Sequence, residues 1–225
     1  MLFPHAGGAA AAYRPLARAL SGHGVDTFIV QYPQRAERLS HPAEPTVGEL
    51  ARQLFAAGDW KQAAPLRLFG HCMGAVVAFE FARIAEAGGV EVARLWVSAQ
   101  QAPSALAELP PLPTADADVL ADMLYLGGTD QRLLDDEDFL ELLVRAVRAD
   151  YQAMARYSCA AEVRIGADIH ALGGTDDHRV ARDHLQRWGI HTTGRFTADL
   201  FDGGHFYLDD HVDTVAQLVS ADGRR

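Results

Sequence analysis

Two patterns of apolar residues alternate along the chain. Short continuous apolar runs, bounded by glycine, proline or polar residues, predict buried strands, whereas apolar residues three and four apart predict amphipathic helices. The expected strands cover residues 1–3, 26–32, 66–69, 92–98, 163–172 and 195–201. The expected helices cover residues 10–20, 46–57, 73–84, 116–126, 136–157, 179–188 and 211–219. Thr46, with Glu49 three residues later, predicts a capping box at the start of the second helix.

Strands that alternate with helices favour a mostly parallel sheet with helices on both faces. The chain has 225 residues, which suits one α/β domain covering residues 1–225. The first expected strand is short, since core strands normally run to about five or six residues. Its three residues indicate either a different strand start or missing residues before Met1.

The alternation stops over residues 103–157. Four prolines fall between residues 103 and 113, and the two expected helices that follow have no strand between them. A helical insertion of this kind in an α/β domain predicts a lid over an active site. The alternative is a separate small helical domain.

A glycine-rich motif marks the turn between the third expected strand and the helix that follows it. Its sequence is Gly70-His71-Cys72-Met73-Gly74, which fits the G-x-nucleophile-x-G pattern of the nucleophile elbow in α/β-hydrolases. Glycines at these two positions allow a strand and a helix to approach closely around a strained central residue. The motif predicts Cys72 as a nucleophile, where most elbows carry serine.

An activated thiol needs a base and a group that orients the base. In this fold, they follow the nucleophile in the order acid, then histidine, each on a loop after a strand. His205 follows the last expected strand in a glycine-rich loop, and we predict it as the base among the ten histidines. Asp176 and Asp177 both follow an earlier strand, and we favour Asp177 as the acid. The alternative role for either aspartate is a helix N-cap.

Two backbone N–H groups are expected to stabilise the oxyanion of the reaction. One belongs to Met73, because the elbow helix begins there and points its amides at the reacting carbonyl. The other is expected from the first loop, His5-Ala6-Gly7-Gly8, with Ala6 as the donor. The alternative is that this loop is a turn with no part in catalysis.

Composition narrows the classes of function. The formal net charge of −10 argues against nucleic acid and anionic membrane surfaces as partners. Two cysteines make no disulfide framework, no metal-ligand spacing occurs, and no apolar run is long enough to cross a membrane. We therefore expect a cytoplasmic monomer that binds no metal and no cofactor.

Several segments together resemble the type II thioesterases, stand-alone α/β-hydrolases that accompany polyketide and non-ribosomal peptide synthetases. They are FPHAGG, VQYPQRAERL, LFGHCMGA, ALGG with a following Asp, GGHFYL and, in the insertion, LGGT and RADYQAMARY. The resemblance implies removal of acyl groups from the phosphopantetheine arm of an acyl or peptidyl carrier protein, as in antibiotic biosynthesis. It also implies Cys72, His205 and Asp177 as catalytic residues, Ala6 and Met73 as oxyanion donors, and an acyl chamber shaped by residues 103–157.

The chain differs from the family at the nucleophile, where the family usually has serine and this chain has Cys72. Some related carrier-protein enzymes with cysteine at this position move aminoacyl groups between carriers and do not release them. Three functions follow for testing. They are hydrolysis through a covalent acyl-enzyme, acyl or aminoacyl transfer between carriers through Cys72, and carrier binding without catalysis.

Overall fold

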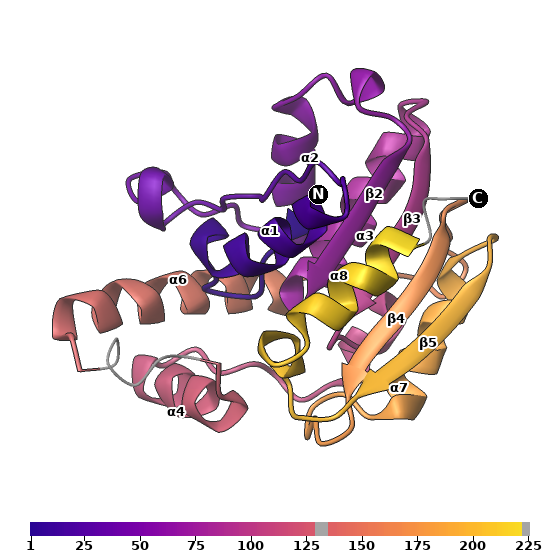
Figure 1. Ribbon diagram of the computed structural model, residues 1–225. Helices are drawn as coiled ribbons and strands as arrows, with labels where there is room; N and C mark the ends of the chain where they lie inside the picture. The colour runs from indigo at the N-terminus through magenta and orange to yellow at the C-terminus, as the bar shows by residue number, and fades with distance from the viewer. Residues whose placement is uncertain (129–134, 222–225) are drawn as a thin grey trace.

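The computed structural model describes residues 1–128 and 135–221 of the chain. Its centre is a parallel sheet of five strands in the order β1-β2-β3-β4-β5. The strands are β1 (Leu2–Phe3), β2 (Leu66–His71), β3 (Val92–Ser98), β4 (Asp168–Gly174) and β5 (Phe196–Phe201). The α/β-hydrolase fold class expected from the alternation is confirmed by the sheet and by helices on both of its faces (Figure 1).

The helices and short 3-10 turns (η) surround this sheet. The helices are α1 (Arg14–Gly22), α2 (Val47–Ala56), α3 (Met73–Ala87), α4 (Asp116–Leu126), α6 (Glu137–Ala155), α7 (Arg182–Gln186) and α8 (Val212–Ala221). The 3-10 turns are η1 (Ala10–Tyr13), η2 (Ala36–Arg38), η3 (Trp60–Gln62), η4 (Pro103–Glu108), η5 (Arg187–His191) and η6 (Tyr207–Asp209). No helix in the described ranges is long and apolar enough to cross a membrane.

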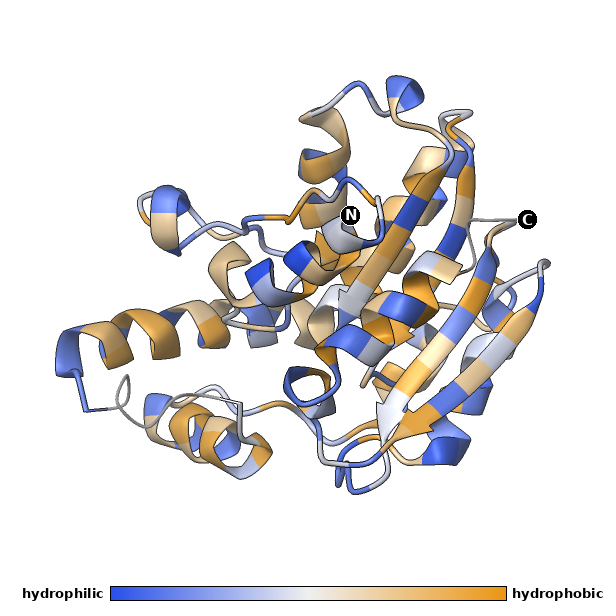
Figure 2. Ribbon diagram, in the orientation of Figure 1, coloured by the Kyte–Doolittle hydropathy of each residue, from blue (hydrophilic) through white to orange (hydrophobic). Residues whose placement is uncertain are grey.

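Side chains alternate between the two faces of the sheet, as the two-residue period of a strand requires. In β3, Leu95 and Val97 join the larger core with α2, α3 and α7, whereas Trp96 joins a second core with α1 and α8. Strands β2 and β3 are buried over most of their length, and Figure 2 shows hydrophobic stretches on them. This two-sided burial explains why these strands are continuous apolar runs in the sequence.

Most element predictions agree with the structure. Thr46 accepts a hydrogen bond from the Glu49 amide, so the predicted N-cap is confirmed. The Glu49 carboxylate accepts from the Thr46 hydroxyl, whereas in a capping box it would accept from the Thr46 backbone amide. The strand predicted at 26–32 is wrong in extent, because only an isolated bridge between Leu2 and Ile29 forms there. Because β1 has only two residues, it offers few backbone hydrogen-bonding partners to a strand beside it.

The last third of the chain holds two further corrections. The strand predicted at 163–172 begins at Asp168 and continues through Gly173 and Gly174, two residues beyond its predicted end. The helix predicted at 179–188 is shorter, because residues 178–181 form a loop before α7 and a 3-10 turn follows it. Between β4 and α7, residues 175–181 form the loop in which the sequence places a catalytic acid.

Helices α4 and α6 lie side by side beyond the carboxyl ends of the strands (Figure 1). They share a small core of their own, made by Val119, Met123, Val144, Val147 and Tyr151. The described residues between β3 and β4 contain no strand. Residues 129–134 of the predicted insertion and residues 222–225 of the predicted domain lie outside the described residues.

Candidate active site

Cys72 sits in the turn between β2 and α3 with a left-handed backbone, at φ 54° and ψ −128°. Such a conformation is strained for a residue with a side chain, and strain of this kind clusters at functional sites. The Cys72 amide donates to the Ser98 carbonyl at 2.8 Å, which fixes the turn against β3. The thiol therefore stands at the carboxyl end of the sheet and at the start of α3.

The two glycines of the motif allow this turn to close. A Cβ on Gly70 would lie 2.2 Å from the Gly74 carbonyl oxygen, and a Cβ on Gly74 would lie 2.0 Å from the Phe3 carbonyl oxygen. Both distances are far below a contact that a side chain can make. The G-x-C-x-G spacing thus reflects the close approach of α3 to β1 and β2.

The loop after β4 brings Asp177 to His205. The Nδ1 atom of His205 and the Oδ2 atom of Asp177 are 2.9 Å apart, and both side chains are buried. The Asp177 Oδ1 atom accepts hydrogen bonds from the amides of Arg179 and Val180. One carboxylate thus makes both the contact expected of a catalytic acid and the contacts expected of a cap.

The Asp176 side chain makes a different contact. It is exposed and accepts a hydrogen bond from the Thr175 hydroxyl. The structure therefore brings Asp177, and not Asp176, together with His205.

The Cys72 thiol and the His205 imidazole influence each other's ionisation. Burial by itself raises the pKa of Cys72, but His205 and the Met73 amide outweigh burial, so the pKa is lowered. Burial by itself lowers the pKa of His205, but Asp177 and Cys72 outweigh it and raise the pKa to about 9. These directions favour a thiolate beside an imidazolium, which is the reactive form of a catalytic cysteine.

The first loop leaves one amide free. The His5 amide donates to the Tyr13 hydroxyl, the Gly7 amide to the Asp150 carboxylate, and the Gly8 amide to the His5 carbonyl. In the described part of the chain, the Ala6 amide has no such acceptor. The Met73 amide, at the first residue of α3, donates to no carbonyl there either. Ala6, Met73 and Cys72 all line one pocket.

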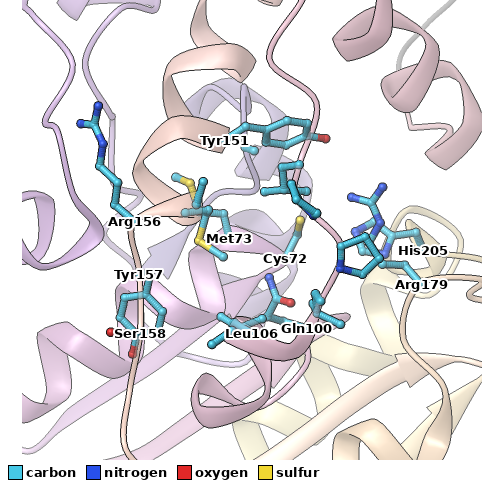
Figure 3. Close-up of a pocket in the computed structure, with 18 residues that line it drawn as sticks. Cys72, Met73, Gln100, Leu106, Tyr151, Arg156, Tyr157, Ser158, Arg179 and His205 are labelled. Atoms are coloured by element: carbon cyan, nitrogen blue, oxygen red, sulfur yellow. The ribbon is translucent and has the colours of Figure 1, made fainter.

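This pocket has a volume of about 420 Å³ and a largely apolar wall. Cys72 lies at its centre, with His205 and Arg179 on one side and Tyr151 on another (Figure 3). Most of the wall comes from the end of η4 with the segment after it, and from the end of α6 with the residues just beyond. These residues are Leu106, Ala107, Leu109, Pro110, Pro111, Leu112, Tyr151, Met154, Ala155, Arg156 and Tyr157. A cavity of this size and apolar character suits an organic group rather than an ion.

The other histidines near the site have structural contacts. His71 is buried with its Nδ1 atom 2.8 Å from the Ser98 hydroxyl, and His5 lies near Tyr13. Burial lowers the pKa of His71 well below its ordinary value and lowers that of His5 to about 3. Such lowered pKa values make both rings weaker proton acceptors than His205, so neither replaces it as the candidate base. Elsewhere, His170 contacts Asp199, and His211 precedes α8.

The structure adds functional candidates that sequence reasoning missed. Arg179 and Tyr151 line the pocket, and both bind the Asp122 carboxylate of α4. Asp150 and Arg35 form a buried ion pair beside the first loop. The segments RADYQAMARY and VQYPQRAERL carry Asp150 and Arg35 in the sequence, but 115 residues separate the two, so no local spacing links them.

No group of three or more histidine, cysteine, aspartate or glutamate side chains within residues 1–128 and 135–221 could hold a metal ion. Cys72 and His205 line the pocket, and Asp177 is hydrogen-bonded to His205.

Known proteins match this chain over nearly all of its length. The family model for the thioesterase domain matches residues 1–222. A segment of the phenyloxazoline synthase MbtB of Mycobacterium tuberculosis is 64% identical over 224 residues, covering 100% of this chain and 16% of that protein. The chain thus spans only a small part of the length of that synthase.

Two relatives are similar over most of their own length. Thioesterase PikA5 of Streptomyces venezuelae is 36% identical over 219 residues, 96% of this chain and 78% of that protein. The solved structure of the type II thioesterase BorB from the borrelidin biosynthetic cluster is 37% identical, with a TM-score of 0.85 and coverage of 99% and 91% of the two chains. By these matches, the chain belongs to the thioesterase domain family of thioester hydrolases.

Proposed function

We propose that this chain hydrolyses acyl thioesters carried on the phosphopantetheine arm of a carrier protein, through a covalent acyl-enzyme on Cys72. The observation that carries the proposal is the position of Cys72. Its thiol opens into the apolar pocket with a lowered pKa, beside a His205 ring that is hydrogen-bonded to Asp177. A nucleophile, a base and an acid that orients the base are the groups that acyl transfer of this kind needs.

The first half of the reaction forms the acyl-enzyme. The Cys72 thiolate attacks the thioester carbonyl and forms a C–S bond, and the carbonyl oxygen becomes an oxyanion held by the amides of Ala6 and Met73. The intermediate collapses by breaking the bond to the phosphopantetheine sulfur, which leaves as a thiol with the proton from His205. Asp177 holds the imidazole in the orientation that this proton transfer requires.

The second half releases the acyl group. Acylation removes the negative charge on Cys72, and that charge is one of the causes of the raised pKa of His205. Neutral His205 then takes a proton from water, hydroxide adds to the carbonyl, and Cys72 leaves as the thiolate. The products are a carboxylic acid and free enzyme.

The carrier-bound substrate is supported by the relatives. PikA5 is a thioesterase, BorB is a type II thioesterase of a biosynthetic cluster, and MbtB is a synthase in which a similar segment occurs. Residues 106–112 and the end of α6 form the pocket wall, which supports a lid role for residues 103–157. In this proposal, the chain works as a cytoplasmic monomer without a resident cofactor, on acyl groups of polyketide or non-ribosomal peptide synthesis.

One observation favours a second candidate, acyl or aminoacyl transfer between carriers. Because Cys72 is a thiol, its attack on a carrier thioester gives another thioester, and this step is nearly thermoneutral and reversible. Thioesters react readily with thiols, so a second carrier could accept the acyl group in place of water. Binding of a carrier without catalysis is a third outcome, and the lowered pKa of Cys72 disfavours it.

An assay with two carriers separates these functions. The chain is incubated with an acyl-loaded carrier, with and without a second carrier that bears an empty phosphopantetheine arm, and free acid and acylated second carrier are quantified. Hydrolysis predicts acid release at the same rate in both reactions. Acyl appearing on the second carrier, with little acid in its absence, would assign transfer, and no turnover would leave binding alone.

A further inference from the structure

The Asp150 carboxylate of α6 holds two distant segments of the chain at once. Its Oδ2 atom accepts hydrogen bonds from the Gly7 amide at 2.7 Å and from the Arg35 Nη1 atom at 2.8 Å. Its Oδ1 atom accepts from the Arg35 Nη2 atom at 2.8 Å, so the pair with Arg35 is bidentate. Bidentate geometry fixes orientation as well as distance.

This ion pair is almost removed from water. The side chains of Arg35 and Asp150 are only 7% and 8% exposed. The remaining Arg35 donor, Nε, binds the Pro33 carbonyl at 2.9 Å, and the guanidinium lies 5.3 Å from the centre of the Tyr32 ring. Loss of one partner would leave a buried charge without compensation, which is costly.

The same face of α6 also packs against the first loop. Val147, one turn before Asp150, lies so close to Gly7 that a Cβ on this glycine would be 2.3 Å from its Cγ2 atom. Ala6 packs against the small core shared by α4 and α6, to which Val147 and Tyr151 belong. Residues three and four apart lie on one helix face, so Val147, Asp150 and Tyr151 support the loop together.

The hydrogen bond to Asp150 also decides which amide of the loop stays free. With the Gly7 amide bound to Asp150, the Ala6 amide is the one that lacks an acceptor in the described part of the chain. An oxyanion site works only if its donors are fixed before the charge develops. Because the loop is fixed at Gly7, the amide of the adjacent Ala6 is held in place before the charge develops.

We infer that Asp150 and Arg35 are positioning residues that act through the Gly7 peptide to hold the Ala6 amide at the oxyanion position. Helix α6 of the insertion therefore sets the geometry of the oxyanion site as well as the pocket wall. The inference rests on the proposed thioesterase function. Loss of this positioning should destabilise the tetrahedral intermediate and leave the thiol unchanged. A general structural role would affect both.

Two rates measured on the same preparations test this separation. Alkylation of Cys72 by iodoacetamide reports the thiolate and needs no oxyanion site, whereas single-turnover acylation by an acyl N-acetylcysteamine thioester needs both. The variants are Asp150→Asn, Asp150→Ala and Arg35→Gln. The matched control is Asp168→Asn, which breaks an ion pair with Arg94 at the opposite end of the strands.

Loss of a single oxyanion donor costs on the order of 10²–10³ in rate, so Asp150→Ala should lose about 10² in acylation. Asp150→Asn keeps an oxygen acceptor for the Gly7 amide but loses the charge, and should lose about tenfold by the same reasoning. Cys72 should be alkylated at the wild-type rate in both variants. Arg35→Gln should resemble Asp150→Asn, and Asp168→Asn should keep both wild-type rates.

Each other outcome has its own meaning. Wild-type acylation by the thioester must be seen first, since its absence would refute the proposed function and not this inference. If the wild type acylates and the Asp150 variants acylate equally fast, the positioning role is wrong. A parallel fall of both rates would also overturn it, because a general disturbance of the site would be its cause. If Asp150→Ala does not fold, Asp150→Asn and Arg35→Gln decide the question by the same two rates.

Discussion

The Nδ1 atom of His205 donates to the Oδ2 atom of Asp177 across 2.9 Å, and the two side chains are only 2% and 0% exposed. Since Oδ1 of the same carboxylate is held by the amides of Arg179 and Val180, the acid cannot turn away from the imidazole without losing three hydrogen bonds. Burial and hydrogen bonding together fix the orientation of the His205 ring.

Asp177→Asn should therefore reduce turnover by on the order of 10³–10⁴, as loss of the acid does in related triads. Asp176→Asn should change turnover little, because its side chain is exposed and accepts from the Thr175 hydroxyl, whereas Asp177 contacts His205. Steady-state hydrolysis of an acyl thioester by the two variants is the measurement. A larger loss in Asp176→Asn would move the acid to that position.

Cys72 should react with iodoacetamide much faster than Cys159 at neutral pH. The pKa of Cys72 is lowered by His205 and the Met73 amide despite burial, whereas burial raises the pKa of Cys159. Alkylation requires the thiolate. Peptide mass spectrometry after short exposures would give both rates, and labelled Cys72 should be inactive. Equal rates at the two cysteines would contradict an activated thiol.

Acylation should have a bell-shaped pH profile. The Cys72 thiolate is lost as the pH falls through its lowered pKa, and the His205 imidazolium is lost as the pH rises through about 9. Acylation needs the first as nucleophile and the second as proton donor to the leaving thiol. The single-turnover rate measured from pH 5 to pH 10 should therefore fall at both ends.

The Asp177→Asn variant provides the control for the upper limb of this profile, the fall in rate at high pH. The hydrogen bond to Asp177 is a main cause of the raised pKa of His205, so its loss should move the upper limb to lower pH. The lower limb depends on Cys72 and should move upward, because a neutral imidazole stabilises the thiolate less. An upper limb that stays at the same pH would contradict the assignment of His205.

Gly74→Ala should unfold the elbow, since its Cβ would lie 2.0 Å from the Phe3 carbonyl oxygen. A matched glycine-to-alanine change at Gly48, inside α2, meets nothing closer than 3.7 Å. It should stabilise the protein by about 0.5–1 kcal/mol through helix propensity. Chemical denaturation of both variants checks the contrast, and a mild effect of Gly74→Ala would contradict the close approach.

The sequence predicts the parts of the fold in which local pattern and tertiary packing agree. The run 92–98 is apolar and forms β3 over the same residues, since both of its faces are covered. Residues 26–32 have the same pattern but form only a bridge, because their neighbour β1 has two residues. The length of a neighbouring strand cannot be seen in a local window.

The same distinction holds at the active site. Cys72 and His205 stand in motifs whose spacing points to their chemistry, and the structure places their side chains where they influence each other. Asp150 and Arg35 carry no such motif, because their link depends on where α6 is placed relative to the first loop. Contacts between segments 115 residues apart follow from the folded chain and not from local spacing.

The covalent acyl-enzyme on Cys72 is the central claim, and the mass of the intact protein tests it most directly. The chain is mixed with an acyl-loaded carrier, and the reaction is quenched in acid within the first turnover. The mass of the intact protein is then measured by mass spectrometry, with Cys72→Ala treated in parallel. The account predicts a mass increase equal to the acyl group, located on the Cys72 peptide and absent from Cys72→Ala. Release of free acid by Cys72→Ala at the wild-type rate would contradict the account.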